Sequence, residues 1–222
     1  MCKRLVCLTT LVSLLALAVA GRADAADPNL AGWWKLDGDA TDSSGNGIHG
    51  TINGDPQWVA GVVGGAGSFD GVDDWIDLGN PPSLPSGKAP RSVCAWALTN
   101  SLGSAWGIVA GYGATGTGQG NGLGRQGAAL SAFGMGTAVR VENFWQVGVW
   151  YHLCMTFDGT VGTLYANGVP LLSQEKPDWN LVLNRARIGR QINDNPEFWI
   201  GLIDDVRLYD IALDAQGIQE CM

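Results

Sequence analysis

The 222-residue chain has few of the side chains that most hydrolases use for acid–base chemistry. It contains two histidines, His49 and His152, and four glutamates. The glutamates are Glu142, Glu175, Glu197 and Glu220. None of them stands two positions from another acid on a predicted strand, the spacing that turns two carboxylates toward one cleft. A Gly-x-Ser-x-Gly segment is also missing. The sequence therefore predicts a protein without catalytic residues, with His152 as an ordinary strand residue.

Basic residues are scarce as well, with 13 Lys and Arg against 21 Asp and Glu and a net charge of −8. A chain this acidic repels nucleic acid and anionic lipid, so neither is expected as a partner. One basic cluster, at residues 185–190, has two interpretations. It contacts an anionic glycan, or it is a strand whose arginines pair with aspartates.

Only one long apolar run exists, and it lies at the N-terminus. Lys3 and Arg4 precede an apolar core at residues 5–20, and small-residue cleavage patterns follow at residues 18–20 and 23–25. This order is typical of a secretory signal peptide. The core is shorter than the roughly 20 residues that span a membrane. We therefore expect a signal peptide at residues 1–25, one domain at 26–222, and a secreted or periplasmic or cell-envelope location without membrane insertion.

Five cysteines occur, and two of them leave with the expected signal peptide. The other three, Cys94, Cys154 and Cys221, allow three pairings and leave one thiol over. Cys221 is the penultimate residue, where chain ends are often frayed. This favours a Cys94–Cys154 disulfide, although two reduced buried thiols remain the alternative.

Short apolar runs between Gly, Asp and Asn indicate an all-β protein, specifically a two-sheet antiparallel jelly-roll sandwich. Asn167-Gly168 predicts a tight hairpin turn. One short helix is expected at residues 214–220, capped by Asp214. The Gly-rich residues 111–127 are interpreted as a slack connection, with a flexible loop over a binding face as the alternative. The expected strands lie at residues 32–36, 48–52, 67–69, 75–78, 91–99, 105–112, 126–133, 138–144, 150–157, 162–166, 170–173, 187–191 and 198–209.

Several segments, in this order, resemble the laminin G-like jelly-roll domains of the concanavalin A-like lectin/glucanase superfamily. The resemblance covers residues 30–219. The placement of the cysteines and the Asn167-Gly168 hairpin is also similar to that of the pentraxins, which bridge the equivalent strands. The segments are residues 34–50, 68–79, 92–96, 150–159, 162–168 and 201–209.

The resemblance implies a structural calcium ion, because domains of this fold often hold one with a carboxylate near the last strand. By position, Asp205 is the expected ligand, with Asp37 and Gly71 as companions. The alternative is that these aspartates accept N–H groups within turns.

A binding role would depend on exposed aromatic rings, on which sugars stack while polar loop residues fix the hydroxyl groups. The rings nearest to loops or strand ends are the candidates, although partial burial in the core is the competing interpretation. We expect a non-catalytic module that recognises a glycan or an extracellular protein surface. The alternatives are a glycoside hydrolase or polysaccharide lyase of the same superfamily, and an adhesion module without a discrete ligand. The candidate rings are Trp106, Tyr112, Trp145, Trp179 and Trp199.

Overall fold

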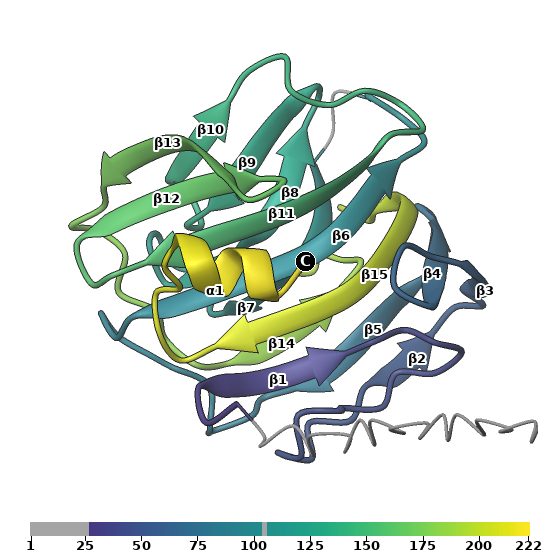
Figure 1. Cartoon of the computed structure of the whole chain (residues 1–222), viewed down its shortest axis with the longest axis horizontal. Helices are drawn as coiled ribbons and strands as arrows, with labels where there is room; N and C mark the ends of the chain where they lie inside the picture. Colours follow the sequence, from purple (N-terminus) through teal and green to yellow (C-terminus); the bar gives the residue numbers. More distant parts are fainter. Residues whose placement is uncertain (1–26, 104–105) are drawn as a thin grey trace, which may run out of the picture.

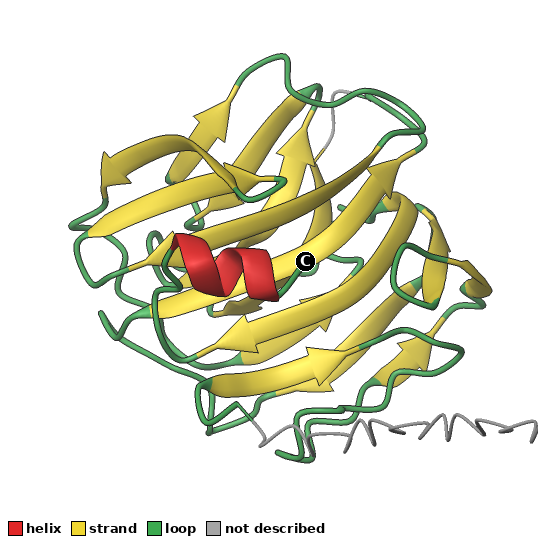
Figure 2. Cartoon of the chain, in the orientation of Figure 1, coloured by secondary structure: helices red, strands yellow, loops and turns green. Residues whose placement is uncertain are grey.

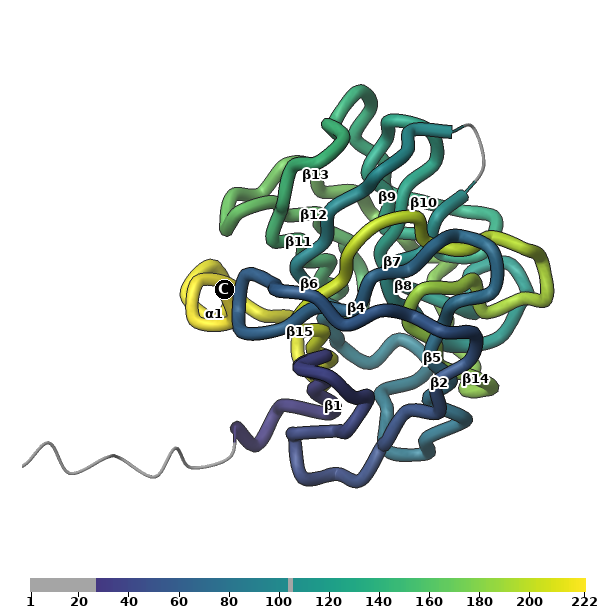
Figure 3. Tube along the Cα trace, turned by 90° about the vertical axis from the view of Figure 1, so that its right-hand side faces the viewer, coloured from purple at the N-terminus to yellow at the C-terminus, as the bar shows by residue number. Residues whose placement is uncertain are grey.

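A computed structural model describes residues 27–103 and 106–222. Within these residues the protein is a sandwich of two antiparallel sheets, which Figure 3 shows edge-on, as the sequence predicts. Figure 2 shows the one short helix of the described chain, α1 (Ala215–Glu220), lying across the outside of one sheet. Asp214 caps this helix by accepting the Gly217 N–H at 2.9 Å.

Sheet A has the order β13-β12-β11-β6-β15-β4-β3, and β1 pairs with the C-terminal half of β15 beside this path (Figure 1). The predicted Asn167-Gly168 hairpin joins β12 to β13, with both turn residues at positive φ. The strands of sheet A are β1 (Leu30–Trp34), β3 (Gln57–Ala60), β4 (Gly65–Asp70), β6 (Arg91–Thr99), β11 (Trp150–Phe157), β12 (Val161–Ala166), β13 (Val169–Glu175) and β15 (Ile200–Tyr209).

Sheet B has the order β10-β9-β8-β7-β14-β5-β2. The Gly-rich residues 111–127, interpreted as a slack connection, instead contain the end of β7 and all of β8, so that interpretation is wrong. Glycine has a low strand propensity, and tertiary packing overrides it here because Leu123 on β8 is fully buried between the sheets. The strands of sheet B are β2 (Thr51–Asn53), β5 (Trp75–Gly79), β7 (Trp106–Gly113), β8 (Gly120–Gln126), β9 (Ala129–Phe133), β10 (Ala138–Val141) and β14 (Arg185–Ile188).

The main core fills the space between the sheets, where alternate residues of each strand meet. Met155 and Phe157 from β11 are fully buried, as are Val206 and Trp199 from the C-terminal part of the chain. Two smaller clusters lie outside this core. One is under helix α1 on sheet A, and the other is on the outer face of sheet B.

Candidate functional site

The outer face of sheet B has a floor of glycines. In register, Arg187 of β14 lies opposite Gly111 of β7, Gly111 opposite Gly122 of β8, and Gly122 opposite Phe133 of β9. A Cβ atom at Gly111 or Gly122 would overlap the Phe133 ring, so the glycines allow this ring to lie flat across the sheet.

A second hydrophobic layer rests on this floor. The buried side chains of Ile108, Phe133 and Ile192 form it, and the partly buried Trp106 and Met135 pack against it. Ile192 belongs to the connection between β14 and β15, which folds back over the sheet. The outer face of sheet B is therefore walled by this connection rather than flat.

A pocket of about 390 Å³ opens between this connection and the turn that joins β9 to β10; we call it the sheet B pocket. Two aromatic rings and five hydrogen-bonding polar side chains contribute to its lining. They are Trp106, Phe133, Thr137, Arg140, Gln191, Asn193 and Glu197. The volume lies within the range of small-ligand sites, about 300–1,000 Å³.

Gln191 holds Glu197 in the pocket wall. The Gln191 N–H donates to the Glu197 carbonyl at 3.1 Å, and its side chain hydrogen bonds to the Glu197 carboxylate. The Gln191 Oε1 atom also accepts the Ile192 N–H at 2.9 Å, which fixes the amide plane. Burial raises the pKa of Glu197, although the hydrogen bond from Gln191 offsets part of that effect.

The predicted basic cluster anchors the same connection. The Arg187 guanidinium donates to the carbonyls of Gln191 and Asn193, at 2.8 Å each. Arg185 pairs with Asp194 at 2.8 Å, and Arg187 approaches the same carboxylate at 3.7 Å. Of the two interpretations, the structure has the strand whose arginines pair with an aspartate. In the structure these two arginines hold the wall of the sheet B pocket in position.

The sequence missed Gln191, Asn193 and Glu197, because polar residues of a loop carry no pattern that distinguishes a ligand-facing side chain from a solvated one. A usable signal did exist in β8, where Gly120, Gly122 and Gly124 alternate. Small residues along one face of a strand indicate that another part of the chain packs closely there.

Four of the five candidate aromatic residues are wrong as ligand contacts, because their rings are buried in the main core. Trp179 and Trp199 are fully buried, and Tyr112 and Trp145 nearly so. Three of these side chains have internal partners: Trp179 Nε1 donates to Thr137 Oγ1 at 3.0 Å, Trp199 Nε1 to the Leu202 carbonyl at 3.2 Å, and the Tyr112 hydroxyl to the Pro85 carbonyl at 3.1 Å. Only the fifth, Trp106, lines the sheet B pocket.

The predicted metal ligands do not converge. Asp205 is buried, accepts the Trp33 indole N–H and pairs with Arg207 at 2.8 Å, so its charge is already compensated. Asp37 bonds Gly65 at the start of β4, whereas Gly71 follows the end of that strand. The structure therefore removes Asp205 and Gly71 from the predicted set of calcium ligands.

Asp204 occupies the position that was expected for Asp205. Its Oδ2 atom accepts the N–H groups of Val62 and Val63, at 2.7 and 2.9 Å. Its Oδ1 atom is buried and has no hydrogen-bond partner among the described residues. Burial, with contributions from the charges of Asp205 and Asp37, raises the pKa of Asp204 to about 6.

A second acidic group comprises Asp70, Asp73 and Asp74, which bring one carboxylate oxygen each to within 4.8 Å of the others. The two Asp74 oxygens accept backbone N–H groups from Asp55 and Asp70, at 2.8 and 3.1 Å. Asp70 accepts the Val72 N–H at 2.8 Å. These carboxylates fasten the turn before β5.

A larger hollow of about 1,010 Å³ lies on sheet A between α1 and β1; we call it the α1 groove. Its aromatic residues are Trp33 and the buried Tyr209. The Lys35 ammonium and the Arg207 guanidinium lie 4.6 and 4.7 Å from the Trp33 ring. Because cations already occupy the space over this ring, the α1 groove is less suited to sugar stacking than the sheet B pocket.

The predicted disulfide is confirmed: Cys94 on β6 and Cys154 on β11 face each other across the two strands and are bonded. Cys221 is not frayed, because it is 2% exposed beneath helix α1. The expected signal peptide lies outside the described residues. Within residues 27–103 and 106–222 no helix has the length and apolar character to cross a membrane.

Sequence and structure comparisons support this architecture. A family model described as the concanavalin A-like lectin/glucanases superfamily matches residues 69–219, more than half of the chain. No curated protein sequence matches.

Among solved structures, domain 4 of AbnA, an extracellular arabinanase from Geobacillus stearothermophilus in complex with arabinotriose, is similar. It is 27% identical with a TM-score of 0.70, over 87% of this chain and 98% of that domain. The binding domain of Paraclostridial Mosquitocidal Protein 1 is 15% identical with a TM-score of 0.69, over 86% of this chain and 51% of that one. A Trypanosoma rangeli sialidase is 16% identical with a TM-score of 0.64, over 86% and 32%.

Proposed function

Because the chain belongs to the concanavalin A-like lectin/glucanases superfamily, we propose that it is a non-catalytic module that binds a glycan in the sheet B pocket. The observation that carries the proposal is the half-buried Trp106 ring beside several polar side chains, of which Gln191 and Glu197 hold each other in place. An apolar ring face suits the C–H face of a sugar, and a few placed donors and acceptors select its hydroxyl groups.

The composition of the pocket favours binding over hydrolysis. Glu197 is the one carboxylate among the described residues that line it. Most glycosidases flank the scissile bond with two carboxyl groups. Glu197 instead serves as an acceptor for sugar hydroxyl groups, with Gln191 and Asn193 beside it.

The arabinanase domain indicates which ligands to test first. Its structure contains arabinotriose, and its 27% identity to this chain extends over nearly its whole length. Short neutral oligosaccharides, pentose chains included, are therefore the proposed ligand class. A location outside the cytoplasm fits with this, because disulfides such as Cys94–Cys154 persist under oxidising conditions.

A structural calcium ion is the second part of the proposal, with Asp204 and Asp37 as its ligands. The loop at residues 61–65 passes between them: a Cβ atom at Gly61 would strike the Asp204 carboxylate, and one at Gly64 would strike Asp37. Calcium prefers hard oxygen ligands. The unpartnered Asp204 Oδ1 atom provides one, and the positive charge would offset the cost of burying this carboxylate.

The test is a glycan array probed with the mature protein, with and without a chelator, followed by calorimetry on each positive glycan. We expect binding to neutral oligosaccharides, loss of binding in Trp106→Ala, and unchanged binding in the exposed sheet A variant Glu175→Gln. Hydrolysis of the bound glycan would contradict the non-catalytic assignment. Equal affinity of wild type and Trp106→Ala would contradict the assignment of the pocket.

A further inference from the structure

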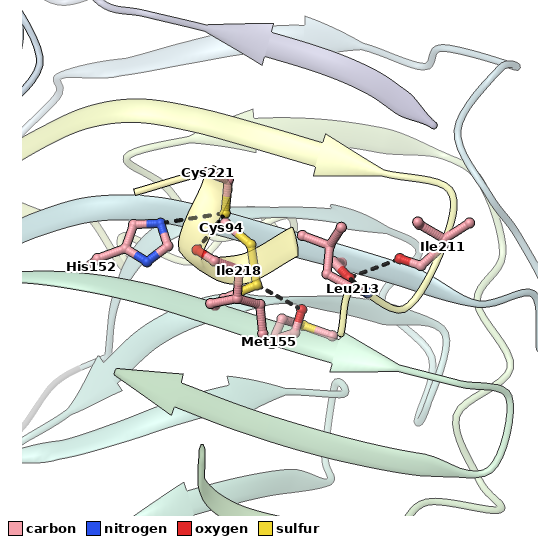
Figure 4. Close-up of a disulfide and its surroundings, with 9 residues drawn as sticks. Cys94, His152, Met155, Ile211, Leu213, Ile218 and Cys221 are labelled. Carbon is pink, nitrogen blue, oxygen red and sulfur yellow. Dashed lines mark hydrogen bonds between the residues drawn. A yellow bond between two sulfur atoms is a disulfide. The ribbon is translucent and has the colours of Figure 1, made fainter. Parts of the chain in front are cut away.

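Three cysteines meet on the outer face of sheet A. Cys94 and Cys154 are direct cross-strand neighbours, and helix α1 packs over them with Ile218 and Cys221. All three cysteines belong to one buried cluster, and none is more than 2% exposed. Figure 4 shows the Cys221 sulfur beside Cys94. The third thiol is therefore enclosed together with a disulfide rather than exposed at a loose chain end.

The surroundings hold Cys221 in place. The Cys221 thiol donates to the Ile218 carbonyl at 3.3 Å, and its N–H donates to the Gly217 carbonyl at 3.1 Å. The next residue is fastened as well, because Trp96 Nε1 donates to the Met222 carbonyl at 3.1 Å.

A hydrogen-bond partner also lies near the thiol. His152 precedes Cys154 by two residues on β11, so both side chains point to the same face of sheet A. The His152 Nε2 atom lies 3.8 Å from Cys221 Sγ (Figure 4). With its proton on Nδ1, the neutral ring presents Nε2 as an acceptor.

We propose that Cys221 exchanges with the disulfide inside the folded protein and forms a Cys94–Cys221 bond. Hydroxide from the solvent removes the Cys221 proton, and the resulting thiolate attacks Cys94 Sγ. The Cys94–Cys154 bond breaks as the new bond forms, and Cys154 leaves as a thiolate that takes up a proton from water. One disulfide is broken and one is made, so no oxidant or reductant is consumed.

The exchange changes which elements of the fold the disulfide connects. Cys94–Cys154 joins two strands that backbone hydrogen bonds already hold together, whereas Cys94–Cys221 joins helix α1 to sheet A. The helix has six residues, and together with Cys221, which caps its end, it supplies one wall of the α1 groove through Gln216 and Glu220. The second pairing would therefore fix that wall. This device does not depend on glycan binding at sheet B.

Exchange should be fastest in mild alkali. Burial raises the pKa of Cys221 to about 11, so thiolate is scarce at neutral pH. The ionisable groups around the thiol are His152 on β11 and Asp205, Arg207 and Tyr209 on β15. Of these, Arg207 favours the thiolate and Asp205 opposes it.

The test follows the free thiol of the folded wild-type protein. The protein is incubated in mildly alkaline buffer, quenched and denatured in acid, and alkylated in acid with vinylpyridine; peptide mass spectrometry then locates the tag. We expect a tag at Cys221 initially and a growing share at Cys154, with a matching Cys94–Cys221 peptide. A tag that stays entirely at Cys221 at every time point would overturn the proposal.

A variant provides an independent test. Cys154→Ala retains Cys94 and Cys221 and, after purification under air, should contain their disulfide and no free thiol. Circular dichroism checks that it is folded. A folded variant with two free thiols would overturn the proposal, and so would a disulfide between two molecules in place of the internal one. In Cys221→Ser, the matched control, no tag should appear at Cys154.

Discussion

Gln191 and Glu197 are joined twice, by a main-chain hydrogen bond of 3.1 Å and by a bond between their side chains. This pair joins the start of the segment that forms the wall of the sheet B pocket to its end. Arg187, through its bonds to the carbonyls of Gln191 and Asn193, ties the same segment to the sheet.

The Gln191–Glu197 pair predicts two separable effects on binding. Glu197→Gln keeps the shape but replaces an ionised acceptor, so glycan affinity should fall about tenfold, the value of one charge-assisted hydrogen bond. Gln191→Leu leaves the carboxylate but frees its orientation, and it should weaken binding to a similar extent. Calorimetry measures both, with Glu175→Gln as the control. Full affinity in Glu197→Gln would remove this carboxylate from the site.

Trp106 and Trp179 should respond to substitution in opposite ways. Trp179→Ala empties a fully buried site and should lower the free energy of unfolding by about 3–5 kcal/mol. Trp106→Ala acts at a half-buried ring and should cost about 1 kcal/mol or less while abolishing glycan binding. Urea denaturation and calorimetry on the same samples separate the two effects. A large stability loss in Trp106→Ala would assign this ring to the core.

Calcium should raise the melting temperature of the wild-type protein but not that of Asp204→Asn. Without the ion, the raised pKa of Asp204 means that stability from this group is present below its unfolded pKa and is lost as pH rises through about 6. Asp204→Asn should therefore be more stable than the wild type at neutral pH in chelator. Thermal melts with calcium and with chelator check this. Equal calcium responses in both proteins would place the ion elsewhere or nowhere.

His152 should make the protein sensitive to acid. Burial lowers its pKa to about 4, below the ordinary value of 6.5, so the unfolded chain binds the extra proton first. Stability from this residue is present above pH 6.5 and is lost as pH falls toward 4, by an amount on the order of 3 kcal/mol.

The comparison with His152→Gln isolates this effect from that of Asp204, which has the opposite sign over the same range. Unfolding free energies are measured from pH 7 to pH 4 for both proteins. The difference between them should change across the interval. A constant difference would mean that His152 titrates normally in the folded protein.

Much of the fold follows from local patterns in the sequence. Asn167-Gly168 specifies its hairpin because both residues accept positive φ, and Asp214 specifies the helix start through its cap. The Cys94–Cys154 bond follows from two cysteines within strong strand signals. The Gly-rich strand β8 has no turn or cap motif of this kind: its alternating glycines indicate only that another segment packs closely there, and the strand is stabilised by neighbours distant in the sequence.

The residues of the candidate sites could not be predicted from the alternation of side chains along a strand. The register of β15 shifts between Asp204 and Arg207, and Asp205 has a positive φ of 50°. This bulge exchanges the expected places of the two aspartates, so Asp205 meets Arg207 and Asp204 meets the loop at residues 61–65. The aromatic candidates failed for a related reason: Trp179 and Trp199 lie near loops in sequence, but those loops turn inward.

The location of the glycan site is the central claim, and the indole N–H signals of an ¹⁵N-labelled sample test it most directly. During titration with the best ligand from the array, the Trp106 signal should shift progressively with ligand, while the signals of Trp33 and Trp96 on sheet A remain in place. A shift confined to Trp33, with Trp106 unmoved, would move the binding face to the α1 groove and contradict the account.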